Sequence, residues 1–433
     1  MQRILVLSSL TLAVAAGEVH PLTLQRAAEL ALSRNPELVL ARLDEQTARR
    51  QVDVARDPFV PKVFAGSGLA YSSGFPMTVG GQAPSVFEVN GAAALFDRPA
   101  ERLVAQRREE AAAAAAGAEH QQDRILLRTV ELFLEARRLA RVATAVGGQI
   151  EVLQRVAEAV GQQLEAGRIL ALEASRARLD VARARQRLQV AMADQDYAEA
   201  RLASVLGFAP GDRVRAVEED LPAAVLPASE EEAAAAALAG HPEIRRLESE
   251  LRARGYALDA VKAERLPRVN LLAKYGLFAR FNNYEDFFRR FERHNAQVGL
   301  SFEIPLRPGP AQQARISQSE IAIERLRAEL DASRSRIDLE ARRHFQEIGQ
   351  AETAVEVARL DLEVAREEVG GLVARLEEGR ASLIEVEAAR YAENEKWISY
   401  FQARHRLDIA RYRLLDQTRG LTAAVRQAAK KRN

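Results

Sequence analysis

Apolar residues recur at steps of three and four along most of the chain, which is the period of amphipathic helices. In residues 22–56 and again in 233–264 this spacing predicts helices, and Pro36 suits the first turn of one of them. Residues 100–209 and 311–433 contain no proline and are rich in Ala, Leu, Glu, Arg and Gln. They predict long helices. The first would run from Arg98 to about Glu165, a length of ~100 Å at ~1.5 Å per residue.

Shorter segments between these helices alternate between apolar and polar residues. Residues 297–304 do so strictly, with Val298, Leu300, Phe302 and Ile304 as the apolar members. This is the period of a strand with one apolar face. With the turn residues between paired segments, the pattern predicts β-hairpins at about 61–97 and 267–306. The aromatic and charged loop at 280–291 is compatible with a nucleic-acid patch or a membrane interface, and we favour the interface.

A heptad seam of small apolar residues follows the later part of each long helical stretch. Gly167 and Gly379, each followed by arginine, predict the turns where the long helices reverse. The seam of the second returning helix becomes polar at Glu393 and Lys396. Alanine at many seam positions permits close helix approach, so the pattern predicts coiled-coil hairpins. The seam positions are Ala174, Ala177, Val181, Ala184, Leu188, Ala191, Gln195, Ala198, Leu202 and Val205, then Val386, Ala389, Glu393, Lys396, Tyr400, Ala403, Leu407, Ala410 and Leu414.

The chain contains an internal duplication. Pro36 and Pro61 recur as Pro242 and Pro267 at one constant offset, and residues 164–168 recur as 376–380 at an offset about six residues larger. Such self-similarity indicates an internally symmetric fold. We predict a signal peptide at 1–17, a first repeat at 18–208 with its helical hairpin at 98–207, a linker or equatorial region at 209–232, a second repeat at 233–420 with its helical hairpin at 311–420, and a C-terminal tail at 421–433.

The first residues resemble a secretory signal: a short basic start, an apolar run of about a dozen residues, and small residues at its end. The alternative is a buried first helix. No later segment has the uncharged apolar length of a membrane helix. Export normally favours disulfides, but the chain has no cysteine, so its stability would depend on packing.

Composition argues against several classes of function. The 62 Lys and Arg are interleaved with 61 Asp and Glu, whereas a nucleic-acid partner would require concentrated basic residues. The six histidines lack the close spacing of metal ligands, and no phosphate-binding or dinucleotide-binding glycine motif is present. We therefore predict no catalytic site, no cofactor and no metal site, so the chain is not expected to be an enzyme.

Four predicted strands cannot enclose a pore by themselves. A bilayer tolerates no open sheet edge, so a membrane role requires closure with other copies, and three chains would supply twelve strands. The alternative is a soluble sheet packed on the helices.

These motifs resemble the TolC-like outer-membrane efflux family. The resemblance lies in Leu22–Leu32 followed by Asn35-Pro36-Glu37, and in two strand-to-helix transitions, residues 95–99 and 304–309. It implies a mainly α fold with a transmembrane β-barrel: a homotrimer with twelve strands in the outer membrane and a periplasmic α-barrel of helical hairpins. The implied partners are outer-membrane lipid, a periplasmic membrane-fusion adaptor and an inner-membrane transporter of the RND or ABC type.

The resemblance also implies roles for particular residues. The hairpin tips that would contact the adaptor are Leu164, Gly167, Arg168, Leu376, Gly379 and Arg380. An acidic constriction would follow the second tip, with Glu385 at its first position. At its second position this chain has Ala388, with Glu387 one residue earlier, and Glu173 is the counterpart of Glu385 in the first repeat. Three copies of Glu385 at a narrow mouth would bind cations and shift toward protonation. The alternative for Glu385 is a solvated helix face.

The resemblance implies a passive exit duct of a tripartite efflux or secretion system, and the sequence offers no catalytic residues against it. The alternative is a soluble periplasmic coiled-coil adaptor or scaffold, which would explain the helical hairpins but not two equivalent β-hairpins. The resemblance does not distinguish drug, metal and protein cargoes.

Overall fold

The computed structural model describes residues 18–68, 85–217, 225–278, 292–306 and 309–430. Contacts divide the chain into two units. Unit 1 takes the described parts of Met1–Leu40, Glu119–His241 and Arg334–Asn433, and unit 2 takes those of Ala41–Ala118 and Pro242–Ser333. The predicted signal peptide and the 280–291 loop lie outside the described residues.

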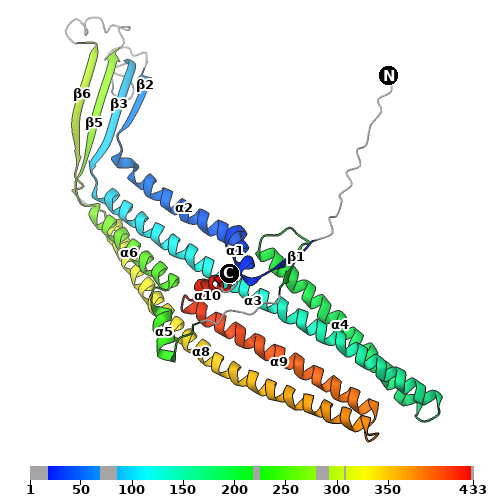
Figure 1. Cartoon of the computed structure of the whole chain (residues 1–433). Coiled ribbons are helices and arrows are strands. Elements are labelled where there is room, and N and C mark those ends of the chain that lie inside the picture. The colour runs from blue at the N-terminus through cyan, green and yellow to red at the C-terminus, as the bar shows by residue number, and fades with distance from the viewer. Residues whose placement is uncertain (1–17, 69–84, 218–224, 279–291, 307–308, 431–433) are drawn as a thin grey trace, which may run out of the picture. The chain divides into compact units, whose positions relative to one another are not determined.

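Unit 2 contains an antiparallel sheet of strand order β2-β3-β5-β6 (Figure 1). Its strands are β2 (Lys62–Gly68), β3 (Ser85–Phe96), β5 (Arg268–Phe278) and β6 (His294–Glu303). The strands of each predicted β-hairpin are neighbours, and β3 joins β5 with Gly91 opposite Ala273. The sheet therefore unites one hairpin from each repeat, with β2 and β6 at its edges.

The apolar face predicted for β6 is not covered by the described residues of the chain. Val298 is 80% exposed and Phe302 66% exposed, and Leu300 between them is also exposed. On the opposite edge strand Val63 and Phe64 are exposed as well. Large apolar side chains in such numbers at a sheet surface indicate a membrane or protein contact. A soluble sheet packed on helices would have buried this face.

Polar contacts join the helices of unit 2, both between the two repeats and within the second repeat. These helices are α6 (Pro242–Ala263), most of α2 (Pro36–Arg56), and the first parts of α3 (Arg98–Glu165) and α8 (Pro310–Glu377). The short 3-10 helix η1 (Asp57–Phe59) follows α2 and precedes β2. Arg252 pairs with Glu109 at 2.8 Å, and Arg315 pairs with Glu264 at 2.8 Å.

Unit 1 contains the two helical hairpins. The first consists of α3 and α4 (Ala171–Val205), and the second of α8 and α9 (Leu383–Gln417). The predicted bounds of the first long helix are confirmed, since α3 spans Arg98–Glu165. Both seams are mainly buried, and the polar centre of the second is paired across the hairpin: Glu393 lies 3.6 Å from Arg366 and Lys396 lies 2.9 Å from Asp361.

Several smaller elements of unit 1 were not predicted. β1 (Val19–Leu22) pairs in parallel with β4 (Arg213–Ala216), so Leu22 ends a strand and does not begin a helix. β4 lies inside the predicted linker, and α5 (Glu230–Leu238) begins there. The second long helical stretch breaks near Arg419, at φ 60, before α10 (Leu421–Lys430) in the predicted tail.

The core of unit 1 lies where these small elements meet the hairpins. Phe133 and Ile125 of α3 pack in one cluster with residues of α1 (Leu24–Arg34), α4, β4 and α10. Full burial of one such large apolar side chain contributes roughly 1.5–3 kcal/mol. Asn35, directly before α2, binds to this core, since its side-chain amide donates a hydrogen bond to the Val205 carbonyl at 2.8 Å. The helical hairpins are therefore anchored at the ends opposite their tips.

Candidate functional site: the hairpin tips and the helix starts beyond them

Both helical hairpins reverse through the same turn. At the first tip, Arg168 N–H donates to the Gln163 carbonyl at 2.9 Å and Gly167 N–H donates to the Leu164 carbonyl at 2.9 Å. The second tip repeats both bonds from Arg380 and Gly379. This is the Schellman motif, which requires a left-handed residue after the helix. Gly167 has φ +69 and Gly379 has φ +72, so backbone conformation explains both glycines.

The predicted tip residues form two similar exposed surfaces. Gly167, Arg168, Gly379 and Arg380 are exposed, while Leu164 and Leu376 are half-buried beneath them. Arg380 also lies 3.3 Å from Glu378. The two tips therefore present the same backbone shape with an arginine at the same place, and their contact with an adaptor stays a prediction.

The helix after the second tip begins with a capping box. Ser382 N–H donates to Glu385 Oε2 at 2.7 Å, and Ser382 Oγ donates to the same oxygen at 2.8 Å. In return, Glu385 N–H donates to Ser382 Oγ at 3.2 Å. The backbone hydrogen bond and then the hydroxyl of Ser382 lower the pKa of the Glu385 carboxyl. Within one chain, Glu385 is therefore held ionised, opposite in direction to the shift expected from three clustered copies.

The helix after the first tip begins without such a cap. Leu170 stands at the N-cap and makes no side-chain cap hydrogen bond. Glu173, the counterpart of Glu385, instead pairs with Arg176 at 3.0 Å on an exposed surface. An exposed pair of this kind contributes roughly 0–1 kcal/mol. The pair with Arg176 is therefore the one contact that holds Glu173 among those described, in place of a capping box.

Glu387 does not share the surface of Glu385. It is only 3% exposed, with Arg390 Nη1 at 3.4 Å and Arg155 Nε at 3.9 Å from its Oε1. Two residues along a helix correspond to nearly opposite faces, so the fold directs Glu387 toward α3 and α4. This burial favours a different place for Glu387 than the predicted constriction, whereas Ala388 is exposed.

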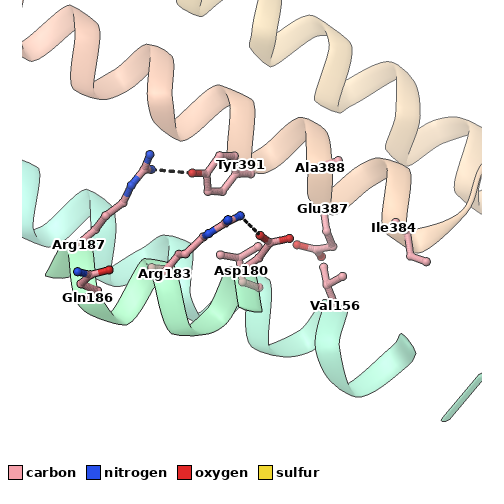
Figure 2. Close-up of a pocket in the computed structure, with 11 residues that line it drawn as sticks. Val156, Asp180, Arg183, Gln186, Arg187, Ile384, Glu387, Ala388 and Tyr391 are labelled. Carbon is pink, nitrogen blue, oxygen red and sulfur yellow. Dashed lines mark hydrogen bonds and ion pairs between the residues drawn. The ribbon is translucent and has the colours of Figure 1, made fainter. Parts of the chain in front are cut away.

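A polar network that joins the two hairpins was missed from the sequence. Arg187 Nη1 donates to Tyr391 Oη at 2.6 Å and to Glu395 Oε1 at 2.9 Å (Figure 2 draws the first contact). The buried Gln149 donates to the same Glu395 oxygen at 3.2 Å. Residues of α3, α4 and α9 thus meet at one carboxylate. No local sequence motif predicts this network, because its residues are far apart in the sequence.

Closer to the core, further ion pairs connect α3 with α9. Arg137 pairs with Asp408 at 3.1 Å where both are buried, and His405 lies 3.1 Å from Glu135. The hydrogen bond from His405, followed by that from Arg138, lowers the pKa of Glu135 to about 2. Contacts between the hairpins are therefore charged over much of their shared length.

Nothing in the described residues suggests a metal or a membrane helix. They contain no group of three or more His, Asp or Glu placed to hold a metal ion. None of the helices described combines the length and apolar character required to cross a membrane.

The uncovered strands joined to long helical hairpins are the fold of TolC-like outer-membrane channels. The chain matches a membrane protein from Pseudomonas aeruginosa with a TM-score of 0.76 at 18% identity, covering 91% of this chain and 90% of that one. It matches the outer membrane protein VceC from Vibrio cholerae with a TM-score of 0.74 at 17% identity, covering 92% and 96%. At these identities the likeness shows the fold.

The sequence itself belongs to the outer membrane efflux protein family, whose pattern matches residues 27–208 and 233–425. The outer membrane efflux protein BepC from Brucella suis biovar 1 (strain 1330) is 23% identical over 304 residues. That alignment spans 70% of this chain and 65% of BepC. The chain is an outer-membrane protein with a large periplasmic portion, and its family is one of channels and not of enzymes.

Proposed function

We propose that this chain is the exit duct of a tripartite efflux or secretion system, which conducts its cargo passively to the exterior. The observation that carries this proposal is the uncovered apolar face of β6, on a sheet with two edge strands. In a bilayer each edge must be paired, because no water is present to satisfy it. Three copies would join β2 of one chain to β6 of the next and close a twelve-stranded barrel.

Two apolar stripes on unit 1 support the same homotrimer. On α4 four exposed apolar residues follow steps of 7, 11 and 7, while the exposed Met192 lies on another face. On α8 four exposed apolar residues follow steps of 18, 3 and 4, so each set of four lies on one face of its helix. We propose that the stripe on α4 packs against the stripe on α8 of the next copy. The residues are Leu172, Leu179, Val190 and Tyr197 on α4, and Leu339, Val357, Leu360 and Val364 on α8.

We assign adaptor contact to the two tips. The Schellman turns place Gly167 and Gly379 at the ends of the hairpins, exposed and followed by arginine. A fixed turn limits the conformational entropy lost on binding, which suits a docking surface. The adaptor would be a periplasmic membrane-fusion protein, and its inner-membrane partner a transporter of the RND or ABC type.

For the constriction we retain Glu385 and leave Glu387 out. The capping box fixes the Glu385 carboxylate in a charged state at the start of α9. Three such groups brought together would attract cations. Glu173 is the weaker candidate, because its exposed pair with Arg176 neutralises it locally.

Fractionation tests the duct directly. The purified outer-membrane fraction should contain a detergent-dependent trimer of this chain, and Val357→Asp together with Val364→Asp should shift it toward monomer. The matched control, Glu356→Asp, alters an exposed residue of α8 outside the stripe and should leave the trimer intact. Recovery of the unaltered chain as a water-soluble monomer would contradict the proposal.

A further inference from the structure

A cavity of about 620 Å³ lies in unit 1 between α3, α4 and α9 (Figure 2). Its apolar wall includes Leu153 and Val156 of α3 and Ile384 of α9, and Tyr391 adds an aromatic ring. Its polar wall includes Glu387, Asp180 and two arginines of α4. It is large enough for a small organic molecule, which pockets of this composition bind through a few polar groups.

Glu387 is the unusual group in this cavity. Figure 2 shows its side chain extending from α9 toward Asp180 and Val156. Its side chain is 97% buried, and Oε2 has no hydrogen-bond partner within the described chain. A buried polar atom without a partner destabilises the fold, and does so more when it is charged. A donor entering the cavity would therefore relieve this destabilisation.

The arginines of the cavity wall are already engaged. Arg187 donates to Tyr391 and Glu395, and Arg183 lies 3.5 Å from Asp180. The contacts of Arg155 and Arg390 are both with Oε1 of Glu387. The remaining acceptor, Oε2, thus favours a ligand that carries its own N–H donor.

We propose that this cavity binds an organic cation, a protonated amine or amidine on a small aromatic or aliphatic body. Its N–H group would donate to Glu387 Oε2, and its body would lie against Leu153, Val156 and Tyr391. Charge-assisted hydrogen bonds of this type are about twice as strong as neutral ones. An anion without an N–H or O–H group could not donate to Oε2, which would stay without a partner. This site is separate from the proposed constriction at Glu385 and does not depend on the duct proposal.

Benzamidine and benzamide test the site because they share a shape and differ in charge. Ligand-observed NMR titration of the full-length protein in detergent should show benzamidine binding at least tenfold more tightly than benzamide. Glu387→Gln should remove that difference. Glu158→Gln, which alters an exposed glutamate of α3, should keep it. Equal binding of the two compounds to the unaltered protein would overturn the proposal.

A second variant separates loss of charge from loss of folding. Ala388→Leu, at an exposed position on the cavity wall, should weaken benzamidine binding by steric filling and leave the thermal transition unchanged. If both Ala388→Leu and Glu387→Gln bind benzamidine with unchanged affinity, the compound binds outside this cavity. That result would also overturn the proposal. Because the readout is binding alone, it is independent of trimer formation and efflux.

Discussion

The two helical hairpins reverse through one turn type but begin their returning helices differently. After the first tip stands Leu170, with no side-chain cap, and Glu173 pairs with Arg176 on the surface. After the second tip, Ser382 and Glu385 cap each other. An N-cap of this kind contributes about 1 kcal/mol. The tips thus share a Schellman turn followed by arginine. Of the two helix starts described beyond them, the second holds its carboxylate in a capping box and the first does not.

The largest effect is expected from Gly379→Trp, which tests whether the two tips are equivalent. Any side chain at φ +72 costs roughly 1–2 kcal/mol, and the indole would occupy the exposed turn. We expect at least a tenfold loss in the adaptor recovered with the duct, with trimer and membrane insertion intact. Gly379→Ala isolates the backbone strain, and Gly167→Trp reports on the other tip. If Gly379→Trp recovers as much adaptor as the unaltered chain, the second tip does not contact the adaptor.

Asp416 offers a comparison at the base of the second hairpin, where the first repeat has Ser204. Burial raises the pKa of Asp416 to about 7 from 3.8, and the carboxylates of Asp123 and Glu131 add to the shift. The folded chain therefore binds a proton that the unfolded chain releases, so stability from this group falls as pH rises from about 4 to 7.

Asp416→Asn should therefore raise the thermal midpoint at pH 8 by at least about 2 °C, on the scale of ~1 kcal/mol. The gain should nearly vanish below the ordinary pKa of 3.8, at about pH 3, where the carboxyl is mostly protonated in both states. Asp53→Asn, at an exposed residue of α2, serves as the matched control. A gain of equal size at both pH values would show that the charge is not the cause.

The capping difference predicts a smaller effect. Ser382→Ala removes the cap of α9 and should speed amide hydrogen exchange in its first turn about fivefold, equivalent to ~1 kcal/mol. Leu170→Ser should slow exchange at the start of α4, since Glu173 would then complete the same box. Exchange that stays unchanged in both variants would mean that the two helix starts are equivalent after all.

The smallest effect concerns conductance. Glu385→Gln should weaken block of the open channel by divalent cations in planar bilayers by about threefold. Glu173→Gln should have less effect, because Arg176 already neutralises that carboxylate. Identical cation block in both variants and in the unaltered protein would mean that Glu385 lies on a solvated helix face and not at a constriction.

Much of this architecture follows from local sequence signals. Gly167 and Gly379 identify the turns because few other residues adopt a left-handed backbone, and helix composition sets the bounds of α3. The spacing Ser382-x-x-Glu385 also carries the signature of a capping box, which our sequence interpretation overlooked. The strands β1 and β4 were missed because each has four residues and pairs only with the other.

The cavity and the polar network could not be predicted in this way. Glu387 looks like any surface glutamate until α3 and α4 are placed against α9. Likewise, Gln149, Arg187 and Glu395 are ordinary helical residues that acquire a role only by meeting one another. Their contacts depend on the relative rotation of helices distant in sequence, which a heptad pattern determines only coarsely.

The polar centre of the α9 seam has a consequence for helix alignment. A run of alanines fits a neighbouring helix nearly as well after a slide of one turn, since each position meets another small residue. Charges do not, because such a slide would separate Glu393 from Arg366 and Lys396 from Asp361. The stacking of Arg366 over Trp397, 4.5 Å from the ring centre, adds a third marker. The second hairpin therefore buries less apolar surface at this point, and its charged pairs fix the register between the turns of α8 and α9.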